Sequence, residues 1–197
     1  MHALTVIRTY LKLGLLNVLQ YRGDFVFQVI SIAINLATAL LTIGIIFDQT
    51  DSLNGWMPNE LMALVGIQML MRGLVTMVIL PSMEAFMEGV RLGTFDFLLT
   101  KPADAQLLTS VSQFNAASIA NVVIGLGVIL VSMGRLGAAI GPGDALLFVV
   151  LLMAGAVIVY SFLMILATCS FWFVRLNNIL VIFSVMFDNA GRWPITA

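Results

Sequence analysis

The sequence has 197 residues, of which 61% are hydrophobic and 10% are charged, and its formal net charge is −1. Soluble domains carry about 25% charged residues, so this composition excludes an ordinary soluble domain and indicates a membrane protein. The sequence contains no tract of Lys and Arg that could bind nucleic acid, and its single cysteine, Cys169, excludes a disulfide within the sequence.

Residues 1–24 are predicted to form a helix that lies in the membrane interface. Arg8 and Lys12 interrupt the apolar run that a signal peptide requires. They lie beside an apolar stripe at helical spacing, formed by Leu4, Ile7, Leu11, Leu15 and Val18. This pattern favours an in-plane amphipathic helix. The alternative is a plain cytosolic extension.

Apolar segments that follow are long enough to cross a membrane. A membrane-spanning helix needs about 20 apolar residues. In lipid, backbone N–H and C=O groups find hydrogen-bond partners only within a helix or a closed barrel. We expect spans over 25–47 and 61–80, with Pro81 at the end of the second, and two more within 111–133 and 146–174. A fifth apolar run, 176–187, is shorter than a standard span. The predicted fold class is therefore an all-α polytopic membrane protein with about five spans.

The basic residues predict a cytosolic N-terminus. In that orientation the inner segments hold six Lys and Arg residues and the outer segments hold two, as the positive-inside rule requires. No linker separates two domains, so we predict one transmembrane domain over 1–197. No membrane-exit boundary follows the ending 192–197, and we therefore expect the domain to be C-terminally incomplete.

The cytosolic segment 81–104 is predicted to hold two short amphipathic helices. Gly93 suits the left-handed position that ends a helix, and Thr94 is the expected cap of the next one, with Asp96 in its first turn. The first helix carries an apolar and a charged stripe, namely Met83, Phe86, Met87 and Val90, and Glu84, Glu88 and Arg91. The second has an apolar surface formed by Phe95, Phe97, Leu98 and Leu99. Such a pair can dock into a groove of a soluble partner or merely cap the bundle, and the pattern leaves both open.

The stretch 88–102, EGVRLGTFDFLLTKP, resembles the cytosolic signature of type-two ATP-binding-cassette (ABC) export permeases. In that family an acidic and basic helix leads to Gly-Thr, an acidic-apolar segment and a Leu-Leu-x-x-Pro ending. The matching positions here are Glu88, Arg91, Gly93, Thr94, Asp96, Leu98, Leu99 and Pro102. The ending 192–195, Arg-Trp-Pro-Ile, is similar to a segment before the last span in a bacterial branch. The family has six spans, one more than we expect here.

The resemblance implies that the chain is the membrane-spanning subunit of an ATP-driven exporter in a bacterial cytoplasmic membrane. A separate ATPase subunit would bind ATP and magnesium, so the chain would be no enzyme and would hold no cofactor or metal. A second permease copy or homologue, membrane lipid and a small amphiphilic substrate would be its other partners. The residues expected to couple to the ATPase are Glu84, Glu88, Arg91, Gly93, Thr94, Phe95, Asp96, Leu99 and Pro102. Neither Lys12 nor Lys101 has the neighbours of a P-loop lysine.

Arg72 lies near the middle of the second predicted span, where a charge is costly unless it faces protein or water. We expect it on the translocation path, where it would meet an anionic substrate group, or at a dimer seam. The alternative is a structural role with Asn35, Gln68 or a backbone carbonyl as partner.

Two further patterns in the third and fourth spans favour structural roles. Gly141 to Asp144 matches the letters of an intramembrane aspartyl protease motif, but no second aspartate lies clearly within a span, which favours a turn. Small residues are predicted to allow close helix packing in the third span, where amides add polar contacts: Ala116, Ala120, Gly127 and Gly134, with Gln113, Asn115 and Asn121. An ion-coupled secondary transporter or channel without an ATPase is the alternative function. It would usually leave acidic residues within the spans.

Overall fold

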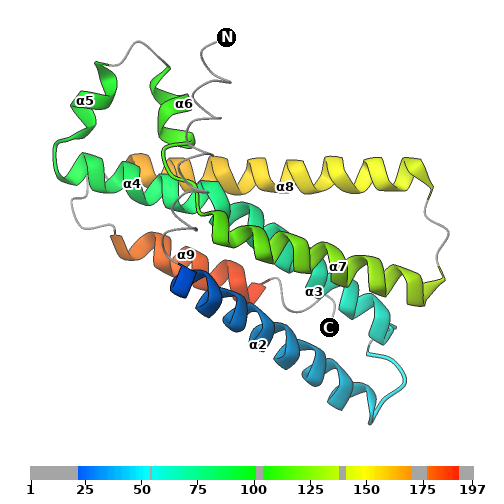
Figure 1. Cartoon of the computed structure of the whole chain (residues 1–197). Helices are drawn as coiled ribbons and strands as arrows, with labels where there is room; N and C mark the ends of the chain where they lie inside the picture. The colour runs from blue at the N-terminus through cyan, green and yellow to red at the C-terminus, as the bar shows by residue number, and fades with distance from the viewer. Residues whose placement is uncertain (1–21, 54, 101–103, 138–140, 170–176, 191–197) are drawn as a thin grey trace.

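The computed structural model describes residues 22–53, 55–100, 104–137, 141–169 and 177–190. Most of the predicted N-terminal interfacial helix and all of the ending 192–197 lie outside these residues. The elements, in chain order, are α2 (Arg22–Phe47), α3 (Pro58–Leu74), the π-helical turn η1 (Val75–Ile79), α4 (Leu80–Arg91), α5 (Phe95–Leu99), α6 (Ala105–Ser110), the 3-10 turn η2 (Ala116–Ser118), α7 (Ile119–Leu136), α8 (Pro142–Thr168) and α9 (Asn177–Ala190) (Figure 1).

Four helical segments in the described part are long and apolar enough to cross a membrane. They are Phe25–Phe47, Pro58–Arg91, Ala116–Leu136 and Pro142–Thr168. This confirms the predicted all-α polytopic membrane fold. The fifth predicted span corresponds to α9, which at 14 residues is shorter than a membrane-spanning helix.

The second span does not end at Pro81, as the sequence suggested. Its helix runs without a break over Pro58–Arg91, 34 residues. At 1.5 Å per residue this is about 51 Å, well above the roughly 30 Å of a bilayer hydrocarbon core. Pro81 is accommodated in the first turn of α4, directly after the π-helical turn, where Leu80 N donates to Val75 O, five residues back. One continuous helix therefore joins the span to the charged residues near its C-terminal end.

The third and fourth spans begin where side chains cap their first turns. Asn115 Oδ1 accepts a hydrogen bond from Ala117 N (3.1 Å), so the third span starts at η2, inside the expected range 111–133, and it continues past that range to Leu136. Asp144 Oδ2 accepts one from Gly141 N (3.0 Å) at the start of α8. Asp144 is thus part of the turn that opens the fourth span, as expected.

Close packing of α3 against α7 forms the centre of the described bundle. A Cβ added to Gly125 of α7 would lie 2.8 Å from Leu70 N and 2.9 Å from Gly66 O of α3, so the two backbones touch there. The prediction for small residues in this span was only partly right. Ala116 is buried, but a Cβ on Gly127 or Gly134 would meet nothing within 4 Å.

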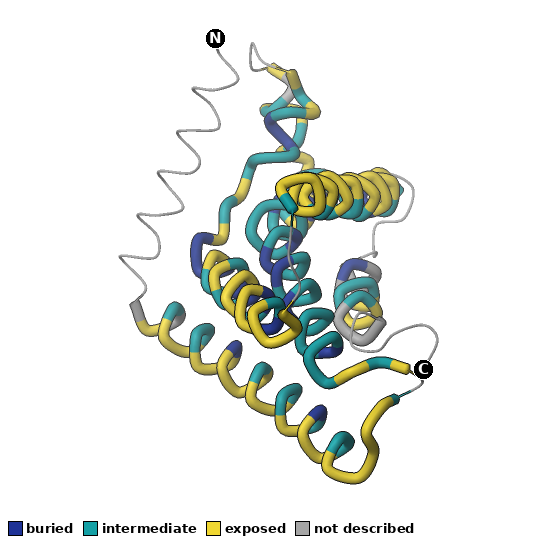
Figure 2. Tube along the Cα trace, turned by 90° about the vertical axis from the view of Figure 1, so that its right-hand side faces the viewer, coloured by how far each residue is buried: buried dark blue, intermediate teal, exposed yellow. Residues whose placement is uncertain are grey.

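The apolar stripe of α4 packs into the described core. Met83, Phe86 and Met87 are buried together with Leu163 and Ala167 of α8 and Leu180 of α9. By contrast, α2 and α8 expose many of their apolar side chains (Figure 2). A membrane protein exposes such surfaces to lipid or to other subunits.

Candidate functional site

The turn between α4 and α5 forms a tight, regular elbow, which we call the coupling elbow and define as residues 88–99. Gly93 has a φ of +69°, a conformation that favours glycine. Thr94 N donates to Gly89 O (2.9 Å) and Gly93 N donates to Val90 O (3.2 Å). This is the Schellman pair of hydrogen bonds that ends a helix. The predicted role of Gly93 as a helix stop is confirmed.

Thr94 and Phe95 differ from the expected picture of a simple second helix. The Thr94 side chain does not cap α5; its hydroxyl lies 3.4 Å from Gly89 O and donates back to the preceding helix. The ring of Phe95 packs edge-on against that of Phe86, with centroids 5.0 Å apart and planes at 86°. Phe95 therefore holds α5 against the core.

Two other apolar residues of the coupling elbow project outward. Phe97 is 73% exposed and Leu92 is 61% exposed. Neither was among the residues predicted to couple. The spacing could have identified Phe97, because residues 95 and 97 are about 200° apart on a helix and only one of them can face the core.

Charged residues surround this exposed apolar pair. Arg91 Nη2 and Glu88 Oε1 form an ion pair (2.5 Å) whose side chains are about half exposed, and Asp96 is exposed on α5. Glu84 lies apart from them, because its side chain lines a cavity between the helices. The structure leaves the Leu99 side chain undescribed, and Pro102 lies outside the described residues.

A line of hydrogen bonds joins the π-helical region to the segment that enters α7. Pro81 has no N–H to offer to Met77 O, and Asn115 N donates to that carbonyl from across the bundle (2.8 Å). The fully buried Ser82 hydroxyl lies between Gln113 O (3.2 Å) and Gln113 N (3.3 Å). We call these contacts, with the bond from Thr76 Oγ1 to Ser118 Oγ (3.1 Å), the polar seam.

The polar seam contains two of the amide residues that were expected to add polar contacts to the third span. Gln113 contributes polar contacts through its backbone, ahead of the third span, and Asn115 contributes through both its backbone N–H and its side-chain oxygen. The signal that could have located the seam is Pro81, since a proline inside a long helix leaves the carbonyl four residues earlier without its usual partner.

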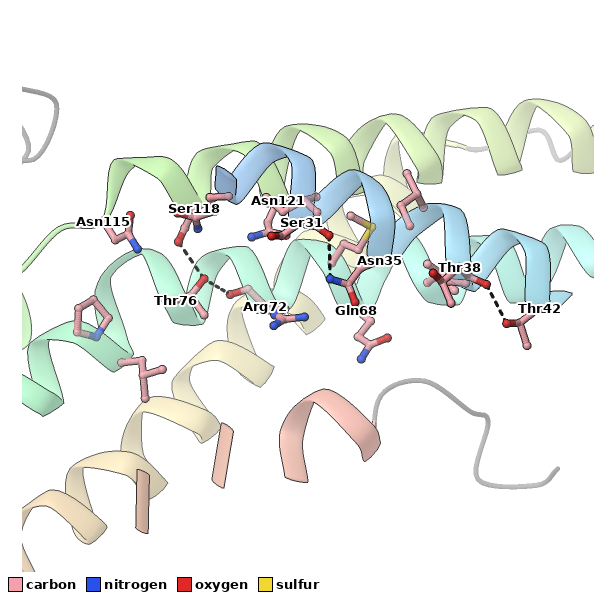
Figure 3. A pocket seen from close by; sticks show the side chains of 18 of the residues that line it. Ser31, Asn35, Thr38, Thr42, Gln68, Arg72, Thr76, Asn115, Ser118 and Asn121 are labelled. Atoms are coloured by element: carbon pink, nitrogen blue, oxygen red, sulfur yellow. Dashed lines mark hydrogen bonds between the residues drawn. The ribbon is translucent and has the colours of Figure 1, made fainter. Parts of the chain in front are cut away.

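A cavity of about 490 Å³ lies between α2, α3 and the start of α7 (Figure 3). This volume is within the range of small-molecule pockets. Arg72 is in its wall, and its backbone carbonyl accepts a hydrogen bond from Thr76 Oγ1 (2.8 Å). Asn35 and Gln68, the partners suggested for a structural role of Arg72, line the same cavity. Position alone therefore leaves both roles of Arg72 open.

The described residues offer no place for a metal ion, because no group of three His, Cys, Asp or Glu side chains comes together among them. Apolar helices of membrane-spanning length around a polar cavity define a multi-pass membrane protein.

The sequence model of a protein family, described as ABC-2 family transporter protein, matches residues 33–197. The match spans most of the sequence, and the chain therefore belongs to the ABC-2 transporter family. No curated protein and no solved structure gives a match. The family makes the chain a membrane permease subunit of an ABC transporter.

Proposed function

We propose that this chain is the membrane-spanning subunit of an ATP-driven exporter in a bacterial cytoplasmic membrane. A separate ABC ATPase docks on the coupling elbow and binds the ATP and magnesium. The observation that carries this proposal is the exposure of Leu92 and Phe97 on an elbow that Phe95 holds against the core. An aromatic side chain held on a short, capped element has the form of an interface anchor.

Movement of the coupling elbow would reach the spans by two routes. The first is direct, because α4 continues through η1 into α3 as one helix. The second runs through the polar seam, which ties Met77 and Ser82 to the segment that opens the third span. Both routes end on walls of the cavity, so closure of the ATPase would change its shape. By family analogy, a second copy of the chain or a homologue completes the pathway.

Replacement of Phe97 by alanine should weaken capture of the ATPase strongly. Removal of a buried aromatic anchor typically costs at least about 2 kcal/mol, or roughly 30-fold in affinity. The measurement is co-purification of a P-loop ATPase with the tagged chain from its own cells, followed by titration of the purified subunits. The folded state should persist, because the Phe97 side chain lies mostly outside the core.

Phe27→Ala is the matched control, because Phe27 is also 73% exposed but lies on α2. This variant should capture the ATPase normally. Equal capture by the Phe97→Ala variant and the unchanged chain would count against docking at the coupling elbow. Failure of any ATPase to co-purify with the unchanged chain would favour a transporter or channel that works without one.

A further inference from the structure

Hydrogen-bonding groups are unevenly distributed in the cavity. Around Arg72 they come from three directions, with Ser31 and Asn35 on α2, Gln68 on α3, and Ser118 and Asn121 at the start of the third span (Figure 3). Asn35 donates one amide hydrogen to Ser31 O (2.8 Å), which leaves its other N–H and its oxygen able to bond a guest molecule. This part of the cavity suits a polar group that accepts hydrogen bonds.

The opposite end of the cavity is effectively apolar. Thr38 and Thr42 line it, but Thr38 donates its hydroxyl to Ile34 O (2.9 Å) and Thr42 donates to Thr38 O (2.8 Å). Both hydroxyl protons are therefore used within α2. The remaining walls at this end are hydrocarbon, from Leu36, Ile43, Leu61 and Val65.

Two charged residues of the helix Pro58–Arg91 make the electrostatic potential differ between the two ends of the cavity. Glu84 lies 12 residues beyond Arg72 on the same helix, about 18 Å further toward the coupling elbow, and lines the cavity there. A negative group is attracted to Arg72 and repelled from the Glu84 end. Arg72 thus places a positive charge between the Glu84 carboxylate on one side and the apolar end of the cavity on the other.

We propose that the cavity binds an amphiphile with one anionic head group, the head at Arg72 and the apolar body between α2 and the first half of α3. The shared chemistry is a carboxylate, phosphate or sulfate joined to a hydrocarbon body, from the cargo or from a bilayer lipid. Assignment of the ligand as the exported cargo rests on the proposed function. Binding itself does not.

Protection of a thiol in the cavity tests this proposal. Cys169→Ser provides the background, and Thr38→Cys adds a thiol that lines the cavity. Asp51→Cys, exposed in the segment that follows α2, is the control for a thiol outside the cavity. The full-length chain in phosphatidylcholine nanodiscs is labelled with a water-soluble maleimide. Three 12-carbon probes are compared: dodecanoate, dodecanol and dodecyltrimethylammonium.

Dodecanoate should protect position 38 and not position 51. Its apparent affinity should exceed that of dodecanol by at least about tenfold, the effect of a charge-assisted hydrogen bond. Arg72→Gln should remove this preference and Arg72→Lys should retain most of it. Protection by all three probes equally would overturn the anionic class, and protection by none would overturn the site. The comparison of probes on the chain with Arg72 intact decides the question even if the Arg72 variants fold poorly.

An anionic lipid, phosphatidylglycerol, in the nanodisc distinguishes a bilayer lipid from the exported cargo as the source of the ligand. Slow labelling of position 38 before any probe is added would support the site but overturn its assignment to cargo. Because the ATPase is not needed, this experiment stays informative if no ATPase binds the chain. Failure of the proposed function and failure of the cavity site are therefore distinguishable.

Discussion

Replacement of Gly125 by leucine should prevent the chain from forming a stable helix bundle. A Cβ at this position would already lie 2.8 Å from a backbone nitrogen of α3, and a leucine carries three further carbons. Overpacking a well-packed core costs about 1–3 kcal/mol when the surroundings can adjust. Here the obstacle is the backbone of an adjacent helix, so we expect at least the upper end of that range. Thermal unfolding of detergent-purified protein, followed by size-exclusion chromatography, measures the loss.

Gly127→Leu is the control for this result. Gly127 is two residues further along the same helix, and a Cβ there would meet nothing within 4 Å. The change in helix propensity is the same in both variants, so the difference in melting temperature reports the contact between α3 and α7 alone. Equal melting temperatures for the two variants would mean that these helices do not approach as described.

Loss of the Ser82 hydroxyl should uncouple the cavity from the ATPase without releasing the ATPase. Ser82→Ala leaves Gln113 N and O without the buried hydroxyl that bridges them. Each hydrogen bond contributes about 0.5–1.5 kcal/mol, so the loss of two is enough to change an equilibrium between two conformations about tenfold. The change in maleimide labelling at position 38 on ATP addition to the permease–ATPase complex should shrink accordingly.

Ser161→Ala makes the same chemical change where it should have no effect. Ser161 is exposed on α8 and donates to Val157 O of its own helix (2.8 Å). If Ser82→Ala keeps the full ATP-dependent change in labelling, α4 and the third span do not communicate through the polar seam. If it loses ATPase binding instead, the seam supports the shape of the coupling elbow rather than the transmission of its movement.

The sequence was sufficient to predict the membrane class and the coupling elbow, because both depend on local patterns. Charge-free runs of about 20 residues mark spans whatever they pack against. Gly93 ends α4 because its left-handed φ and two backbone bonds involve only neighbouring residues. The end of the second span was missed for a related reason. A proline normally interrupts a helix, but a π-helical turn allowed this helix to continue through Pro81.

Contacts between distant segments were not predictable in the same way. In the third span, Asn121 and Ser132 share a buried helix face with Gly125, and these two polar residues are the signal that could have shown that Gly125 rather than Gly127 faces α3. The cavity depends on Arg72 and Asn35, which lie on different helices, and on the use of threonine hydroxyls within α2. These features depend on how each helix is rotated about its own axis against its neighbours. Local sequence patterns do not specify that rotation.

A photo-crosslinking amino acid at position 97 will show directly whether the ATPase sits on the coupling elbow. In living cells, irradiation should give a covalent adduct between this chain and a P-loop ATPase. The same amino acid at position 49, exposed in the segment between α2 and α3, should give none. An ATPase adduct from position 49, with none from position 97, would show that the ATPase does not dock on the coupling elbow.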